Sequence, residues 1–240
     1  MKDRSKIKVL AIIPARGGSK RLPRKNIREI CGRPLLAYTI KAARNAERIT
    51  HFLVSSEDNE IIEVARKYNA PVPFVRPAEL SGDKVRNIDV VDHALRFMEG
   101  AKGVTYDIIV LLQPTSPVRD HGHVDSAVEL LWNSDCDSLA SVKGPFKKRD
   151  PILKAIRNGI LEDYSPVKDL KNVEPFYLYN ASLYAVKRDY FVRHKKLISP
   201  KQIPLIMDKF HSVDVDTDAD FLVAESYINY MKNQNKDNSL

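Results

Sequence analysis

The stretch IIPARGGSKRLPRKNI, residues 12–27, joins the end of an apolar segment to a glycine pair and a run of cations. Residues 7–13, IKVLAII, are continuously apolar, which is typical of a strand buried on both faces of a parallel sheet. Open α/β sheets bind ligands outside the carboxyl ends of their strands. The sequence therefore predicts an anion site in this loop, of a kind suited to a polyphosphate.

The segments after this loop alternate between helical and strand periodicity. Pro34 opens a helix at residues 35–46, and further helices are expected at 58–68, 87–98, 123–132 and 218–231. Strands are expected at 51–56, 71–75, 106–113, 138–143 and 213–215, and residues 182–191 suggest a strand followed by a helix. Such alternation indicates an α/β fold whose mostly parallel strands are joined by right-handed crossovers.

Length and composition favour one domain over residues 1–240. With 43% hydrophobic residues, 240 residues bury one substantial core. The first apolar stretch is interrupted at Pro14 and Arg16, so we expect it to be neither a signal peptide nor a membrane span. We therefore expect the protein to be cytoplasmic. Cys31 and Cys136 are far apart and indicate neither a zinc site nor a disulfide framework.

The charge distribution narrows the class of partner. A net charge of +8 and a pI near 9.3 suit an anion. The cations gather between Arg16 and Arg33, where the aromatic residues used for stacking on single-stranded nucleic acids are missing. A compact phosphate pocket fits better than a nucleic-acid groove, so a basic α/β protein that binds nucleotide or RNA without catalysis is the alternative from a different class.

The periodic pattern fails after residue 143. Residues 144–180 contain many charges and little periodicity, which predicts an extended excursion that acts as a flap or an oligomerisation arm. The basic run at 143–151 is solvated by default, although in a dimer it would be placed to help bind an acidic ligand of the facing subunit.

Three smaller motifs fall at positions that suit a ligand site. Residues 113–117, QPTSP, follow the most apolar strand and so share the sheet edge of the glycine loop. Asp214 and Asp216, two apart at a predicted strand end, would point the same way and share a divalent cation, while neighbouring residues cap the last helix. A calcium-hand loop is excluded because Ala219 replaces its glycine. His121 and His123 are predicted to be a loop pair rather than a metal site.

Neither standard phosphate fingerprint is present around Gly17 and Gly18, because Leu22 stands where the second P-loop glycine is required and GxGxxG is absent. The stretch ARGGSKRLPRKNI, followed by GRPLLAYTIKAA, nevertheless resembles the N-terminal signature of the acylneuraminate cytidylyltransferase family, which makes CMP-activated sialic and related nonulosonic acids. Further similarity lies, in family order, in VSSEDNEI (54–61), RPAELSGD (76–83), LLQPTSPVRD (111–120), YNASLY (179–184) and DVDTDADF (214–221).

This resemblance implies a Rossmann-like, three-layer nucleotide-diphospho-sugar transferase fold and a homodimer whose excursion packs across the partner's active site. It implies a nucleotide site for CTP, an acidic-sugar site and a Mg²⁺ site, with Arg16, Lys25 and Asp216 as catalytic residues. The nucleotide site would contain Arg16, Gly17, Gly18, Ser19, Lys25, Asn26, Arg76, Ser81 and Asp83. The sugar site would contain Gln113, Thr115, Ser116, Asn180 and Tyr184, and the metal ligands would be Asp214 and Asp216.

The chemistry independently requires these residue types. Attack of a sugar hydroxyl on the α-phosphate of CTP builds negative charge on phosphate oxygens, which fixed cations such as Arg16 and Lys25 stabilise. The chain departs from the family pattern at Ala181, where a glycine is usual, and at Lys168 and Lys171, where arginines are usual. These departures leave the acceptor open among nonulosonic acids, with an octulosonic acid cytidylyltransferase as the alternative enzyme.

Overall fold

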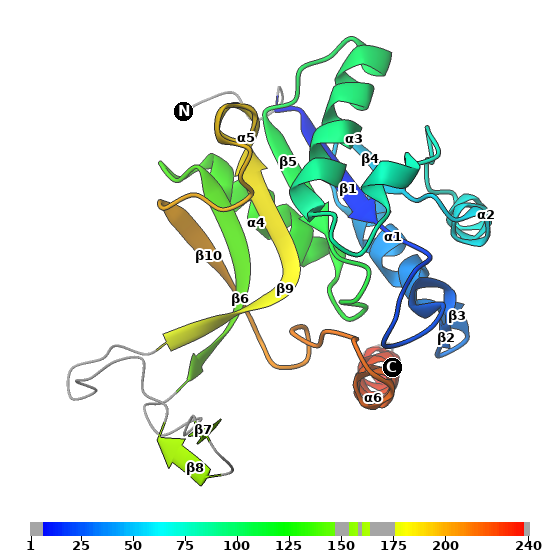
Figure 1. Ribbon diagram of the computed structural model, residues 1–240, viewed down its shortest axis with the longest axis vertical. Helices are drawn as coiled ribbons and strands as arrows, with labels where there is room; N and C mark the ends of the chain where they lie inside the picture. Colours follow the sequence, from blue (N-terminus) through cyan, green and yellow to red (C-terminus); the bar gives the residue numbers. More distant parts are fainter. Residues whose placement is uncertain (1–6, 147–153, 158–159, 164–175, 238–240) are drawn as a thin grey trace.

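The computed structural model describes residues 7–146, 154–157, 160–163 and 176–237. A six-stranded sheet has the order β10-β6-β9-β5-β1-β4, with helices on both faces (Figure 1). Its strands are β1 (Val9–Pro14), β4 (His51–Ser55), β5 (Ile108–Leu112), β6 (Ser138–Phe146), β9 (Phe176–Lys187) and β10 (Gln202–Met207). Strand β9 runs antiparallel to β5 and β6, whereas the other pairs are parallel. The predicted α/β fold with a mostly parallel sheet is confirmed.

The alternating side chains of β1 separate the two helical layers. Val9 and Ile13 pack with α1 (Leu35–Asn45), α2 (Asn59–Lys67) and α4 (His121–Trp132). Leu10 and Ile12 pack with α3 (Asn87–Lys102) and α5 (Arg188–His194) on the opposite face. Both faces of the strand are buried, which explains its continuous apolar sequence. The three-layer arrangement expected from the resemblance is present.

A third apolar cluster attaches the last helix to the loop that follows β1. Helix α6 (Asp218–Asp237) contributes Phe221, Ala224 and Ile228 to a cluster with Leu22 of the glycine loop and Val215. The adjacent ribbon of β2 (Glu29–Ile30) and β3 (Arg33–Pro34) adds Ile30. Two short 3-10 helices, η2 (Lys25–Ile27) and η3 (Ala78–Leu80), complete this edge of the molecule. The packing brings residues near 216 back to the first loop.

Two of the predicted strands do not form. Residues 71–75 are irregular because Pro71 and Pro73 have no N–H to donate to a neighbouring strand. The carbonyl of Pro71 accepts a hydrogen bond from the N–H of Val54 over 2.9 Å. Residues 213–215 are also irregular: the N–H of Val215 donates to the carbonyl of Thr115 over 2.8 Å without extending into a ladder. The alternation of valine and aspartate there reflects one buried side chain in a loop, not a strand.

Strand β10 was not predicted, because Pro204 interrupts its sequence QIPLIM. Proline is tolerated here because β10 lies at the end of the strand order, where one side of its backbone has no partner strand. The long α3 ends at Gly103, whose φ of 63° lies in the left-handed region that favours glycine.

The predicted excursion at 144–180 begins and ends inside the sheet. Strand β6 extends to Phe146 and β9 starts at Phe176, and these two residues are paired. Between them, β7 (Lys154–Arg157) and β8 (Ile160–Asp163) form a separate antiparallel ribbon, which Figure 1 shows away from the main sheet. The predictions made for Lys168 and Lys171 fall outside the described residues. In the described part of the chain, no helix is long and apolar enough to cross a membrane.

Candidate functional site

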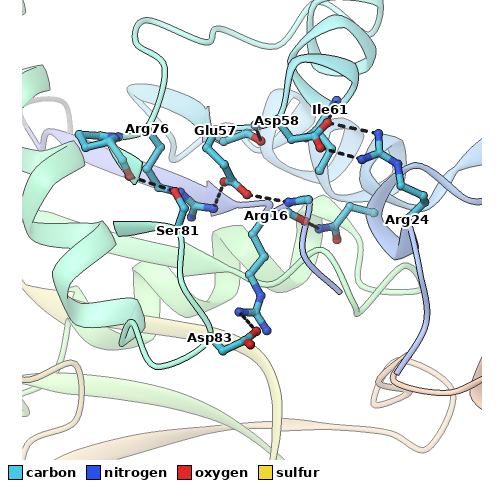
Figure 2. A network of polar contacts seen from close by, with 12 residues as sticks. Arg16, Arg24, Glu57, Asp58, Ile61, Arg76, Ser81 and Asp83 are labelled. Carbon is cyan, nitrogen blue, oxygen red and sulfur yellow. Dashed lines mark hydrogen bonds and ion pairs between the residues drawn. The ribbon is translucent and has the colours of Figure 1, made fainter. Parts of the chain in front are cut away.

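The glycine loop is fixed by a carboxylate from the turn after β4. The N–H of Gly17 donates to Glu57 Oε1 over 2.8 Å, and the other oxygen of Glu57 pairs with the buried guanidinium of Arg76 (Figure 2). A Cβ on Gly17 would lie 2.3 Å from Asp58 Oδ2, so the turn requires glycine. Gly17 therefore shapes the loop, and its N–H is held by Glu57. Gly18 is exposed and has open space around its Cα.

A second ion pair anchors the other end of this loop. Arg24 donates to Asp58 Oδ2 over 2.6 Å, and Asp58 accepts the N–H of Ile61 and so caps α2, as the sequence predicts (Figure 2). The hydrogen bond from Arg24 lowers the pKa of the Asp58 carboxyl. The buried Asn26 donates from its amide to the carbonyl of Arg16 over 2.9 Å. The loop is thus held in shape before any ligand arrives.

A polar cavity of about 500 Å³ lies at the carboxyl edge of β1 and β5. It unites residues that the sequence places in four separate motifs. Its lining includes Arg16, Ser19, Lys25, Asn26, Arg76, Ser81, Asp83, Gln113, Thr115 and Asp216. The predicted convergence of the glycine loop, the 76–83 segment, QPTSP and one aspartate on one site is present.

The cations of this first cavity are paired with carboxylates. Arg16 contacts Asp83 over 2.9 Å (Figure 2). Lys20 pairs with the same carboxylate. Lys25, whose side chain is 15% exposed, contacts Asp216 over 2.9 Å, and the more exposed Arg21 contacts it over 3.1 Å. Lys25 is the most buried of these cations, and its pairing with Asp216 holds its charge at the cavity. Preorganised cations of this kind stabilise developing negative charge.

Asp214 faces a second cavity of about 730 Å³. Its lining combines polar and aromatic side chains with two lysines: Lys143, Tyr179, Asn180, Lys209, Ser212, Asp214, Asp220 and Tyr227. Asp214 and Asp216 therefore do not point the same way from a strand. They lie in a loop, with Asp214 lining the second cavity and Asp216 lining the first. Each nevertheless remains within the electrostatic reach of the other.

The Asp214 carboxylate has an oxygen suited to a cation. Oδ1 is buried and has no hydrogen-bond partner among the described residues, and burial raises the pKa of this carboxyl. An orphaned carboxylate oxygen beside a second carboxylate fits a hard divalent cation such as Mg²⁺, which prefers oxygen ligands. Separate residues cap α6: the hydroxyl of Thr217 accepts the N–H of Asp220, and the Asp220 carboxylate accepts the N–H of Thr217.

The five predicted sugar residues do not gather in one cavity, and Ser116 and Tyr184 line neither of the two. Gln113 and Thr115 line the first cavity, and Asn180 lines the second while bonding Ser141 and Ser212. Tyr184 is half-buried and near enough to Asp214 for that carboxylate to contribute to its raised pKa, which is caused mainly by burial. Ser116 is completely buried and lines neither cavity. The prediction that Ser116 contacts the sugar is therefore not supported by its position, because a fully buried side chain does not reach either cavity.

Sequence reasoning did not assign Glu57, Arg119 or Lys209 to the site. Glu57 orders both Gly17 and Arg76, and a carboxylate directly after a strand at the ligand edge was the available signal. The buried Arg119 donates to the carbonyls of Gln113 and Ser182 over 3.2 and 2.6 Å, and so supports the QPTSP turn. Lys209 follows a strand that was itself missed.

The chain is similar to known proteins over most of its length. The family model described as cytidylyltransferase matches residues 10–231. The chain is 34% identical to the CMP-N,N'-diacetyllegionaminic acid synthase of Legionella pneumophila, over 91% of this chain and 95% of the relative. It is 32% identical to the N-acylneuraminate cytidylyltransferase of Escherichia coli, over 95% of this chain and 54% of that longer relative.

The fold is also found among solved structures. A CMP:2-keto-3-deoxy-manno-octonic acid synthetase complexed with CTP matches with a TM-score of 0.67 at 17% identity, over 93% of this chain and 99% of that one. This likeness is one of fold. The family match over residues 10–231 and the 34% identical relative show that the chain belongs to the cytidylyltransferase family.

Proposed function

We propose that this chain transfers CMP from CTP to the anomeric hydroxyl of an acidic, nonulosonic-type sugar and releases pyrophosphate. The proposal depends mainly on the position of Lys25 and Asp216, which line the cation-rich first cavity. Asp214, two residues from Asp216, lines the second cavity. A nucleotide triphosphate in the first cavity and a sugar in the second would meet at these residues. The relatives named above activate legionaminic and N-acylneuraminic acids, which supports the same class of acceptor.

In this account the fixed cations act on the triphosphate. The new bond joins the sugar oxygen to the α-phosphorus, the bond from that phosphorus to the leaving pyrophosphate breaks, and the hydroxyl loses its proton. Arg16 and Lys25 would exchange their carboxylate partners for phosphate oxygens and stabilise the charge that builds there. Arg76, held by Glu57, and Ser81 would bound the nucleoside end of the cavity.

Asp214 and Asp216 would hold Mg²⁺ in this proposal. When bound, the ion would supply positive charge that offsets the negative charge of the phosphate groups during transfer. Because Asp216 already pairs with Lys25 and Arg21, binding of the triphosphate would draw these cations away and free the carboxylate for the ion. Support comes from the buried, unpartnered oxygen of Asp214.

The second cavity suits an acidic acceptor. Lys143 and Lys209 both line it and would attract a sugar carboxylate, while Tyr179 and Tyr227 offer apolar ring surfaces and hydroxyl groups. We assign the carboxylate interaction to these described lysines in preference to an arginine fork. A lysine acts as a point charge, so the site would select the charge of the acceptor more strongly than its orientation.

A homodimer is part of the same proposal. Tyr179 of β9 and Ile206 of β10 are 51% and 53% exposed, and Tyr177, two residues from Tyr179 on the same strand, is also exposed. A second copy would cover this surface and place its 144–180 excursion across the site. Ile206→Asp should convert a dimer into a monomer in sedimentation experiments, with Leu222→Asp on α6, which is 65% exposed, as the control.

The test is pyrophosphate release with Mg²⁺ and CTP against a panel of sialic, legionaminic, pseudaminic and octulosonic acids. Release with CTP and a nonulosonic acid, but not with ATP, GTP or UTP, is the expected result. Release with the octulosonic acid alone would establish the alternative enzyme. A folded protein that binds CTP but releases no pyrophosphate with any acceptor would favour the non-catalytic nucleotide-binding protein.

A further inference from the structure

Two Asp-x-x-His turns from distant parts of the chain face each other. Asp120 accepts both the backbone N–H of His123, over 3.1 Å, and its ring Nδ1, over 2.6 Å. Asp208 does the same for His211, over 2.9 Å to the backbone and 2.8 Å to the ring. The two imidazole rings lie 4.5 Å apart between centroids. His121 and His123 are therefore not a loop pair, because both lie in the first turn of α4 and the partner of His123 is His211.

This arrangement leaves the two outer ring nitrogens available as ligands. A neutral histidine that donates from Nδ1 to a carboxylate carries its lone pair on Nε2. Metal-binding histidines are commonly oriented in this way, with a carboxylate holding the ring nitrogen that does not bind the ion. The side chains of His123 and His211 are only 20% and 13% exposed, so both rings are held against the protein.

We infer that Asp120, His123 and His211 form a second metal site, specific for a borderline transition-metal ion such as Zn²⁺ and distinct from the Asp214–Asp216 pair. One ligand atom from each of the three residues lies within 4.8 Å of the other two. Tetrahedral ligands about 2.0–2.1 Å from Zn²⁺ are roughly 3.4 Å apart. Because Asp120 Oδ1 accepts from Nδ1 of His123, Asp120 would have to exchange that hydrogen bond for the ion, whereas Asp208 would keep His211 oriented from the Nδ1 side. Two imidazoles disfavour Mg²⁺, which prefers oxygen ligands.

The position of the site suggests what the ion would do. Asp120 ends the segment that contains Thr115, and His211 lies in the loop that leads to Asp214. These two segments already meet where Val215 donates its N–H to the carbonyl of Thr115. A bound ion would join them a second time and would stiffen both segments that line the cavities.

The experiment is a titration of the metal-free, full-length protein with Co²⁺ and Zn²⁺ in excess Mg²⁺, which occupies sites made only of oxygen ligands. Calorimetry should give one Zn²⁺ per chain, and Co²⁺ should show the intense visible bands of tetrahedral coordination. His123→Gln and His211→Gln should each abolish both signals, and Asp208→Asn should weaken binding about 10–100-fold. His194→Gln, on the exposed surface of α5, is the matched control and should bind normally.

Two further measurements separate this site from the proposed Mg²⁺ site and show whether the variants are folded. Asp216→Asn should leave the Zn²⁺ isotherm unchanged, which separates this site from the proposed Mg²⁺ site. Thermal unfolding without metal should show that the histidine variants are folded, and Zn²⁺ should raise the melting temperature of the wild type but not of these variants. Absence of Zn²⁺ binding by the wild type, or equal binding by His123→Gln and His211→Gln, would overturn the inference.

Discussion

Lys25 and Asp216 are separated by 191 residues in the chain and form an ion pair of 2.9 Å at the first cavity. The pair depends on the third apolar cluster, in which α6 and Val215 pack against Leu22 of the glycine loop. Packing of apolar residues thus places a cation and a carboxylate where the proposed triphosphate and its ion would lie. The pair also means that each charge has a partner in the ligand-free state.

Replacement of Lys25 should impair turnover far more than stability. Lys25→Met removes a fixed charge that would stabilise the transition state, so we expect kcat to fall by about 10²–10³-fold. Lys25→Arg keeps the charge but changes its shape, and should recover part of the loss. The check is steady-state pyrophosphate release together with thermal unfolding. A kcat within about threefold of wild type in Lys25→Met would contradict the assigned role.

The two glycines of the loop should respond differently to alanine. Gly17→Ala brings a Cβ to 2.3 Å from Asp58 Oδ2, and Asp58 is held by both Arg24 and the start of α2, so the loop must shift. We expect a loss of about 1–3 kcal/mol in the free energy of unfolding and weaker CTP binding. Gly18→Ala, with nothing within 4 Å of its Cβ, should change stability by less than about 0.5 kcal/mol. Equal effects of the two substitutions would contradict the structure.

Glu57 should prove to be a residue that holds the site in shape. Glu57→Ala leaves the buried guanidinium of Arg76 without its carboxylate, and loss of one partner of a buried ion pair costs about 3–5 kcal/mol. Glu57→Gln keeps an acceptor for Gly17 and should cost less. Denaturant unfolding of both variants measures the difference. If Glu57→Ala is as stable as the wild type, the proposed anchoring of Arg76 is wrong.

Much of the fold follows from the sequence, because continuous apolar runs and helical stripes are local signals. The buried β5, with all five residues inaccessible, and the capped α2 are examples. Long-range packing determines the rest. Val215 suggests part of a strand because valine and aspartate alternate in the sequence there, but its side chain enters the cluster of α6 from a loop.

Part of the candidate site could also be predicted from the sequence. Residues that share the carboxyl edge of the sheet, such as Lys25 and Thr115, converge as expected because parallel strands bring their loops together. Ser116 was assigned to the same surface, but adjacent residues of a tight turn point in different directions, and its side chain enters the core. The facing of His123 and His211 has no local signal, since it requires α4 and the loop after β10 to be packed together.

Asp214→Asn should lower activity and raise stability, and the gain in stability should depend on pH. Because burial raises the pKa of Asp214, the folded protein binds this proton more tightly than the unfolded chain does. Ionisation of Asp214 therefore costs stability, and the cost appears as pH rises through the range in which an unfolded carboxyl titrates. Asparagine removes the cost, so the variant should be more stable than wild type at pH 7, by up to about 1 kcal/mol or roughly 2–4 °C in Tm.

The same substitution should abolish Mg²⁺-dependent turnover, because asparagine carries no charge for the ion. In acid the difference in stability between Asp214→Asn and wild type should disappear, since Asp214 is then protonated in both folded and unfolded chains. Thermal unfolding at several pH values, beside an activity assay, tests both parts. The expected sign would be wrong if the stability of Asp214→Asn relative to wild type were lower at pH 7 than at acid pH.

The most direct test of the central claim follows the fate of the α-phosphate. The protein is incubated with Mg²⁺, a nonulosonic acid and CTP labelled with ³²P at the α-position, and products are separated while pyrophosphate is measured. We expect the label to move into a CMP-sugar, with one pyrophosphate released for each conjugate formed. Release of labelled free CMP without a conjugate, or label that stays in CTP with every acceptor tried, would contradict it.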